Sequence, residues 1–370
     1  MARERADLPL ILPPQIERNI EGRRAVYLDL KDWINLARVV KGLSTPAGYA
    51  ELLLAARRAV QRGTVLFPLS ATHYMEMSGI ADPAQRRDVA SVMEELSGFR
   101  VLLGRPSIMR LEIEAAVDRI QGLSSPVDTL ALLGRSVGWA YGRRGGLRMG
   151  YDGRDVTSDF EQQPWYQEML RVFERRMLEG PSDAEDASLR LANSDYQPEF
   201  VQQFSEQRAL QEREQAARLE AAPRWRRGRL RDVISARELA LEWAEALNAA
   251  VEQRGMSLDD LFDTDREAIR AFADGMPSNS VVISIKTAYH RNSQHTWTAN
   301  DIHDIDALAV AIPYCDAVLT DKAARNAVVS TRVDRQAGTF MPRTAGDLAK
   351  WLDSGGTIGS PASLAEDDAP

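Results

Sequence analysis

The chain has 370 residues, 44% of them hydrophobic, so it is long enough for one large domain with an insertion and its composition is that of a globular protein. Its formal net charge of -8 means that any contact with nucleic acid must come from local basic patches rather than from the overall field. The single cysteine, Cys315, excludes an intramolecular disulfide and fits a reducing compartment, and the N-terminal run LPLILPP is too short for a signal or membrane segment, so we expect a cytoplasmic protein with no membrane partner.

The first firm element is a strand over residues 25–30, because this run is rich in β-branched and aromatic side chains. It follows a polar arm, residues 1–22, and leads into a helix that begins at residue 31. Asp29 therefore lies at the carboxyl end of a strand, just before a helix. At such a position an aspartate either caps the helix or holds a ligand, and the sequence favours neither.

A helix over residues 49–61 and a second strand over residues 64–69 complete a strand–helix–strand unit, which indicates a parallel sheet. Ser70 or Thr72 can cap the next helix, which carries His73 and Glu76 on one face. Most helical glutamates are solvated, but the place of Glu76 directly after a central strand makes it a candidate ligand. A helix over residues 83–96 precedes a third strand over residues 99–103.

Helical patterns with few strand signals fill the region between residues 105 and 277. We expect helices at residues 106–122, 199–222 and 235–254, the last beginning with a capping box between Ser235 and Glu238 and ending at Gly255.

Two basic clusters stand out in this region. The second runs from Arg224 to Arg231 and interleaves arginines with a tryptophan, a pattern that suits a phosphate backbone and a stacked base. The alternative is a solvated loop whose arginines pair with the acidic helix before it. As candidates for nucleic-acid binding we name Arg224, Arg226, Arg227 and Arg229; the first cluster, residues 143–148, is a weaker candidate.

The segment from residue 300 to 321 concentrates acidic residues. Three of them, Asp301, Asp304 and Asp306, open an apolar run of helical period that we expect to end at Pro313. A short buried strand then delivers Asp321 at its carboxyl end, the edge at which ligands bind in open parallel sheets. A helix over residues 323–329, a strand over 338–341 and a helix over 345–352 close the fold, with a flexible tail from residue 354.

Three runs, YLDLKDWINLA, PLSATHYMEM and NDIHDIDALAVAIPYCD ending in LTD, resemble the PIN-like nuclease domain, in particular bacterial members with a split domain. The resemblance implies a small parallel α/β sheet that gathers about four carboxylates around Mg²⁺ or Mn²⁺ and cleaves phosphodiester bonds, usually in RNA. It covers roughly residues 23–104 and 278–352.

Carried over residue by residue, the resemblance assigns Asp29, Glu76 and Asp321 to the acidic site. The third position is open between two aspartates. Asp304 has the family's spacing from Thr320, whereas Asp306 begins a local sequence, Asp306-Ala307-Leu308, that resembles the family's usual motif. We favour Asp304, with Asp301 as a nearby metal ligand, because these two share a helical face whereas Asp306 points away from Asp304 by about 200°.

The chemistry of the side chains supports a metal site independently of the family. Carboxylates brought together repel one another and raise one another's pKa values, so a hard divalent cation stabilises the cluster. Ligands that are all oxygen favour Mg²⁺ or Mn²⁺ over zinc. Such an ion can orient a water in line with a phosphorus atom, which makes a nucleophilic side chain unnecessary.

These observations predict an α/β protein with a PIN-like parallel sheet flanked by helices and interrupted by a large, mainly α-helical insertion. The expected function is that of a metal-dependent endonuclease, with RNA favoured over DNA, acting as a toxin or antiphage defence effector whose insertion chooses the substrate or a protein partner or inhibitor. The alternative is a non-catalytic PIN-like protein whose insertion docks a protein partner. The expected organisation is an arm (1–22), the first half of the core (23–104), the insertion (105–277), the second half of the core (278–353) and a tail (354–370).

Overall fold

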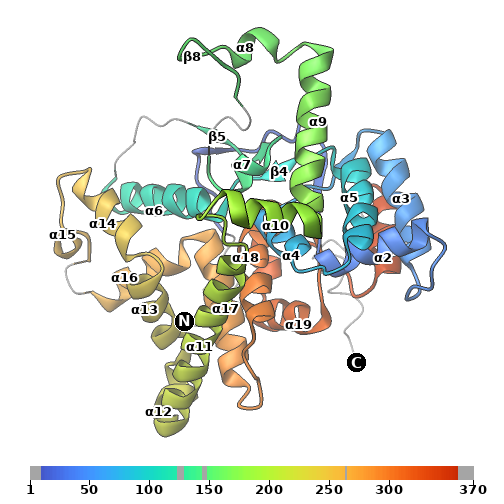
Figure 1. Ribbon diagram of the computed structural model, residues 1–370. Helices are drawn as coiled ribbons and strands as arrows, with labels where there is room; N and C mark the ends of the chain where they lie inside the picture. Colours follow the sequence, from blue (N-terminus) through green and yellow to red (C-terminus); the bar gives the residue numbers. More distant parts are fainter. Residues whose placement is uncertain (1–9, 123–128, 144–147, 263–264, 357–370) are drawn as a thin grey trace.

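The computed structural model describes residues 10–122, 129–143, 148–262 and 265–356. The fold is mixed α/β, with many helices around a small parallel sheet (Figure 1). Parts of the predicted arm (residues 1–9), of the first basic cluster (144–147) and of the tail (357–370) lie outside the described residues.

The centre of the sheet is β2 (Arg24–Leu28), which pairs in parallel with β3 (Val65–Leu66) on one side and with β9 (Ala317–Leu319) on the other. Single parallel bridges extend it at both edges, from Leu69 to Val101 in β4 (Val101–Leu102) and from Ala317 to Phe340. The order across the sheet therefore places the first strand of the core between segments far apart in the chain. As a result, the carboxyl ends of β2, β9 and the segment after β3 meet at one edge.

Both faces of the sheet are buried, and the alternation of side chains sorts them between two cores. Val26 and Leu28 pack with α2 (Leu30–Val40), α3 (Tyr49–Gln61), α5 (Pro83–Ser97) and α21 (Ala345–Asp353). Tyr27, between them in the strand, faces α17 (Pro277–Arg291), α18 (Ala299–Tyr314) and α19 (Lys322–Thr331). Strands covered on both faces explain the nearly continuous apolar runs in the sequence.

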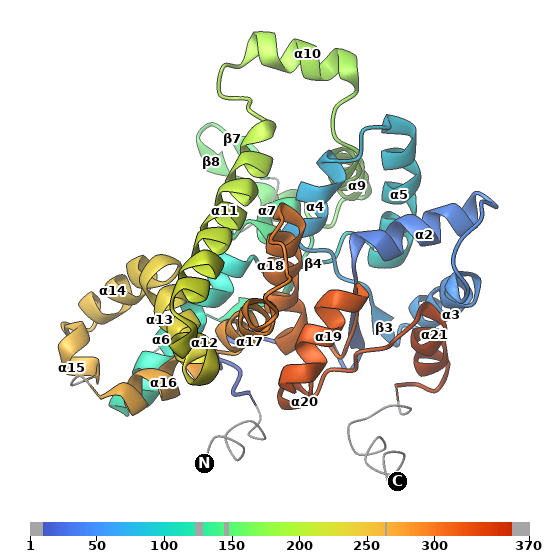
Figure 2. The ribbon, with the colours of Figure 1, turned by 90° about the horizontal axis from the view of Figure 1, so that it is seen from below.

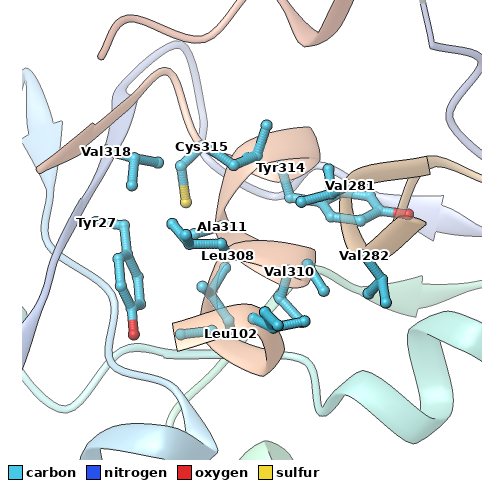
Figure 3. Packing of buried hydrophobic residues seen from close by; sticks show 14 of the residues in the cluster. Tyr27, Leu102, Val281, Val282, Leu308, Val310, Ala311, Tyr314, Cys315 and Val318 are labelled. Atoms are coloured by element: carbon cyan, nitrogen blue, oxygen red, sulfur yellow. The ribbon is translucent and has the colours of Figure 1, made fainter. Parts of the chain in front are cut away.

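Helix α18 occupies the middle of the second core. Leu308 and Ala311 point toward Tyr27 and Val318 of the sheet, while Val310 lies toward α17 (Figure 3). In α17 all residues from Pro277 to Thr287 are buried, so this helix is surrounded by others. Helix α17 therefore lies inside the fold, although it carries buried polar residues such as Asn279 and Lys286.

The region between the two halves of the core is mainly helical, as expected. Its long helix α11 (Glu199–Ala221) passes beside α18, and α12 (Pro223–Gly228) follows at its end near α17 (Figure 2). Several helices of this region share the cores already described; others form two small cores of their own. The helices of the region are α6 (Arg105–Gln121), α7 (Val137–Ala140), α8 (Thr157–Phe160), α9 (Pro164–Glu179), α10 (Asp183–Ala192), α11, α12, α13 (Leu230–Leu241), α14 (Ala244–Glu252), α15 (Leu258–Phe262) and α16 (Arg266–Asp274).

The remaining elements are short. The strand β1 (Ile16–Glu17), in the segment predicted to be an arm, pairs in parallel with β5 (Leu130–Ala131), and β6 (Leu133–Gly134) pairs antiparallel with β4. A hairpin of β7 (Gly150–Tyr151) and β8 (Arg154–Asp155) turns at Asp152 and Gly153, both of which have positive φ. The last two helices of the core not yet named are α4 (Ala71–Ser78) and α20 (Val333–Ala337).

Three local predictions are wrong. Ser235 does not begin a helix, because α13 starts at Leu230, where Leu230 and Ile234 are buried against α17. The expected single helix is also interrupted at Trp243, between α13 and α14. Pro313 does not end α18 but lies inside its last turn. The strand expected over residues 338–341 is a single bridge at Phe340.

Among the described residues, the search for a helix both long and apolar enough to cross a membrane finds none.

Candidate metal centre

Three carboxylates from three separate elements converge at the carboxyl edge of the sheet. Asp29 follows β2, Glu76 lies on α4 and Asp304 lies on α18, and one oxygen of each lies within 4.8 Å of the others. All three side chains are partly buried. Asp29 is at the N-cap position of α2, yet its side chain makes no capping hydrogen bond there, so it is available to the cluster.

Asp321 lies beside this group. It caps α19, where its Oδ1 accepts a hydrogen bond from the amide of Ala324 at 2.8 Å. Its carboxyl is also close enough to hydrogen-bond with that of Asp304 and to raise the pKa of Asp304. Strand pairing fixes the distance to Asp29, because the amide of Asp29 donates to Leu319 O and the hydroxyl of Thr320 reaches Asp29 Oδ2 at 3.4 Å.

The electrostatics of the cluster disfavour full ionisation without a cation. Burial and the charges of Asp29, Asp321 and Glu76 raise the pKa of Asp304 to about 9. Burial and the charge of Asp29 raise the pKa of Glu76 to about 8, and burial together with Asp321 raises that of Asp29, against the lowering effect of Lys31. The four acids lie close together, so each negative charge opposes the next.

The donor set fits a hard divalent cation. The converging atoms are carboxylate oxygens from rigid elements, which suit Mg²⁺ or Mn²⁺. A bound ion would lower these raised pKa values, because its positive charge outweighs the mutual repulsion of its carboxylate ligands. Asp29, Glu76 and Asp304 are the residues that could hold it, with Asp321 adjacent.

The other two aspartates of the triplet have different partners. Asp301 is the third residue of α18, where its carboxylate accepts from the amide of Thr298 at 2.7 Å and the hydroxyl of Thr298 accepts from the amide of Asp301 in return. His295 lies 3.4 Å from its other oxygen. The structure therefore places Asp301 in a capping box and outside the group of three carboxylates.

Asp306 is held between two guanidinium groups. Arg208 of α11 reaches both its oxygens, at 2.5 Å and 3.0 Å, and Arg105 of α6 reaches Oδ1 at 2.5 Å. Despite burial, these two cations lower the pKa of Asp306 to about 2. Asp306 thus links α18 to two helices of the central region and does not face the cluster.

Two histidines support the acidic residues. His73 is completely buried; its Nδ1 accepts from the amide of Ser70 at 2.9 Å and its Nε2 donates to Leu28 O at 2.8 Å, so it joins α4 to the strand end just before Asp29. Burial lowers the pKa of His73 to about 4, which keeps the ring neutral. His303 lies between Glu76, 3.8 Å from its Nδ1, and Ser205, 2.7 Å from its Nε2.

Sequence reasoning missed two groups near the centre. Asp32, one turn after Asp29, is fully buried and accepts a hydrogen bond from the hydroxyl of Tyr49. Its spacing from Asp29 was a usable signal. Tyr289 of α17 comes close enough to Asp304 and Asp321 for their charges to act on it, and no local pattern marks it.

The second basic cluster is partly neutralised and partly free of ion pairs. Arg224 and Arg229 lie over the ring of Trp225, at 5.4 Å and 5.6 Å, and Arg229 also lies 3.6 Å from Asp232. Arg226 and Arg227 are in no ion pair among the described residues. In the first cluster, Arg148 pairs with Asp155.

The chain was also compared with known proteins. No protein-family model, no curated protein and no solved structure matches it.

Proposed function

We propose that this protein is a metal-dependent phosphodiesterase that cleaves nucleic acid at the carboxylate cluster. The observation that carries the proposal is the convergence of Asp29, Glu76 and Asp304 within 4.8 Å, with Asp321 beside them, at the carboxyl edge of a parallel sheet. The order of these acids along the chain agrees with the resemblance to PIN-like nucleases.

In the proposed reaction Asp29, Glu76 and Asp304 hold Mg²⁺ or Mn²⁺. The bound ion supplies an activated water and neutralises charge on the phosphate. Asp321 keeps one oxygen free for the cluster because the amide of Ala324 occupies only Oδ1. Thr320 and His303 orient Asp29 and Glu76 through the contacts at 3.4 Å and 3.8 Å, so that the ligands are positioned before the ion arrives.

The second candidate is the non-catalytic protein whose central helices dock a partner. It is favoured by large apolar side chains in solvent on α10 and α11: Leu191 is 91% exposed, Phe200 61% and Phe204 50%. Such groups are common at protein interfaces. In a docking protein without a metal ion, the mutual repulsion of the four acids would not be offset, so we rank this candidate below the metal-dependent enzyme.

The test is metal-dependent cleavage measured side by side on single-stranded and double-stranded RNA and DNA, with EDTA as the control. We expect cleavage with Mg²⁺ or Mn²⁺ and none with EDTA, and the resemblance implies that RNA is the preferred substrate. Absence of cleavage on all four substrates, together with absence of ion binding, would reject the enzyme in favour of the docking protein.

A further inference from the structure

A cavity of about 220 Å³ lies between α11, α12 and the connection from α17 to α18. This volume is several times the ~30 Å³ that one water occupies in the liquid, so the space suits a larger group. Its wall is rich in cations and aromatic rings: Arg213, Arg226, Tyr289, His290, His295 and Trp297. The acid in this wall is Glu220, on α11.

Three residues of this wall carry a buried polar atom without a hydrogen-bond partner among the described residues. One atom is Nε of Arg226, in the basic cluster on α12. Another is Nδ1 of His290, a side chain that is 1% exposed and whose Nε2 is occupied by Glu212 at 2.9 Å. The third is Nε2 of His295, 3.4 Å from a carboxylate oxygen of Asp301. Buried polar atoms without hydrogen bonds cost free energy, so their presence on residues that line one cavity favours a ligand that supplies the missing partners.

The chemistry of these atoms specifies the ligand. A guanidinium N–H seeks an anionic oxygen, and arginine is suited to phosphate. Because Nε2 of His290 lies against Glu212, Nδ1 is the ring nitrogen left for a ligand, and a sugar hydroxyl, which both donates and accepts, can satisfy it. Arg213 adds a second cation, held against the wall by its hydrogen bond to Trp297 O at 3.1 Å and shared with Glu206 at 3.7 Å. Phosphate and hydroxyl together describe one sugar–phosphate unit.

The cavity lies beside the start of α18, the helix that carries Asp304, because His295 of its wall is 3.4 Å from Asp301. Tyr289 forms part of its wall, stacked on His295 with ring centroids 4.2 Å apart. The same tyrosine is near enough to the cluster that burial and the charges of Asp304, Asp301 and Asp321 raise its pKa. Three further arginines in or next to α12, Arg224, Arg227 and Arg229, are exposed to solvent, so a nucleic-acid strand can run from α12 through the cavity toward the acids.

We propose that this cavity binds one sugar–phosphate unit of the substrate strand next to the cleavage site, with Arg226 and Arg213 as the phosphate ligands. The identity of the ligand as nucleic acid rests on the proposed function. The cavity itself does not: its atoms predict binding of a phosphate whether or not the acids catalyse cleavage.

The test is binding of fluorescently labelled single-stranded 12-nucleotide RNA in EDTA, which prevents cleavage, at several salt concentrations. We expect Arg226→Gln to weaken binding about tenfold, a size typical of a lost specific contact, and to lower the slope of log Kd against log salt by about 0.7. The matched control is Arg87→Gln, at an exposed arginine of α5, which loses the same charge but does not line the cavity. It should change Kd less than about threefold. Equal losses in the two variants would overturn the proposal.

A second variant guards against a folding defect in the first. Ser293→Asp adds a negative charge at an exposed residue of the cavity wall and should also weaken binding about tenfold by repulsion, with an unchanged melting temperature. Wild-type affinity in a folded Ser293→Asp would likewise reject the proposal.

Three probes identify the source of the phosphate: RNA with a 5′-hydroxyl, the same RNA with a 5′-phosphate, and inorganic phosphate as a competitor. Equal loss of affinity for both RNAs in Arg226→Gln assigns the cavity to an internal phosphate, whereas loss only for the phosphorylated RNA assigns it to the strand end. If inorganic phosphate binds through Arg226 but does not displace either RNA, the cavity is an anion site only and the substrate subsite is rejected. Cleavage assayed separately reports on the acids: RNA binding through Arg226 without any metal-dependent cleavage would refute the proposed function and keep the cavity.

Discussion

Asp304 and Asp306 lie two residues apart on α18, and their pKa values are shifted in opposite directions. Burial among three other acids raises the pKa of Asp304 to about 9, and two arginines lower that of Asp306 to about 2 although it is buried as well. The separation of about 200° around the helix turns one side chain to the sheet edge and the other to α6 and α11. One helix thus supplies one acid to the carboxylate cluster and another to the contacts between helices.

The first prediction separates these two roles by activity. Asp304→Asn should lower cleavage by orders of magnitude, because it removes a charged ligand from a centre whose catalyst is the ion. Asp29→Asn, Glu76→Gln and Asp321→Asn should do the same. Since ion-free Asp304 is already protonated at pH 7, its amide variant should remain as stable as the wild type without metal. Loss of cleavage in Asp306→Asn with full cleavage in Asp304→Asn, both variants being folded, would reverse the assignment.

The second prediction concerns stability. Asp306→Asn leaves Arg105 and Arg208 without their carboxylate, and breaking a partly buried ion pair of this kind costs about 3 kcal/mol. Urea unfolding measures the change. The matched control is Asp353→Asn, which removes the exposed partner of Arg58 and should cost less than about 1 kcal/mol.

The same variant gives a pH dependence of known sign. The pKa of Asp306 is lower in the folded protein than the value of about 3.9 in an unfolded chain, so its stabilisation is complete above that pH and is lost as the pH falls toward 2. The difference in unfolding free energy between wild type and Asp306→Asn should therefore be largest at pH 7 and shrink by pH 3. A difference that grows in acid would show that the arginines do not hold this carboxylate.

The third prediction is that ion binding releases protons. Asp304 and Glu76 have pKa values of about 9 and 8 without metal, so both carry protons at pH 7 that a bound ion displaces. Affinity for Mn²⁺ should consequently rise as the pH rises from 6 to 8. Calorimetry in buffers of different ionisation enthalpy counts the protons, and Asp304→Asn should release fewer. An affinity for Mn²⁺ that does not change with pH would contradict the raised pKa values.

The fourth prediction tests the cap at the start of α18. Asp301→Asn keeps an acceptor for the amide of Thr298 but loses the charge near His295, so it should cost less than about 1 kcal/mol and reduce cleavage less than tenfold. Melting temperature and initial rate, compared with Asp304→Asn, check both parts. An Asp301→Asn as inactive as Asp304→Asn would return Asp301 to the ligand set.

The local sequence predicted the candidate site residues that follow the ends of strands. Asp29, Glu76 and Asp321 could be predicted because each follows a short apolar strand. Asp304 was favoured because it has the spacing from Thr320 that the family resemblance implies, and helical geometry separates it from Asp306. The start of α18 could also have been predicted, since Thr298 and Asp301 have the spacing of a capping box. We expected the helix to begin at Asp301, whereas it begins at Ala299.

The remaining features depend on contacts between distant segments. Arg105 and Arg208 are far from Asp306 in the chain, and nothing near either arginine signals its partner. Ser235 and Glu238 have the spacing of a capping box, yet the burial of Leu230 and Ile234 starts the helix five residues earlier. In that case tertiary packing outweighed a local preference.

The interior of the molecule also contains Lys286 of α17, 3% exposed, between Glu212 of α11 at 2.9 Å and Glu238 of α13 at 2.7 Å. Were the central helices to detach, this ammonium group would lose both carboxylates and the buried apolar residues of α17 would meet water, at a cost of several kcal/mol. Detachment is therefore too unfavourable to occur as a separate step, and the chain should melt in a single cooperative transition. A chain shortened by excising residues 105–277 should accordingly fail to fold rather than yield a smaller folded protein.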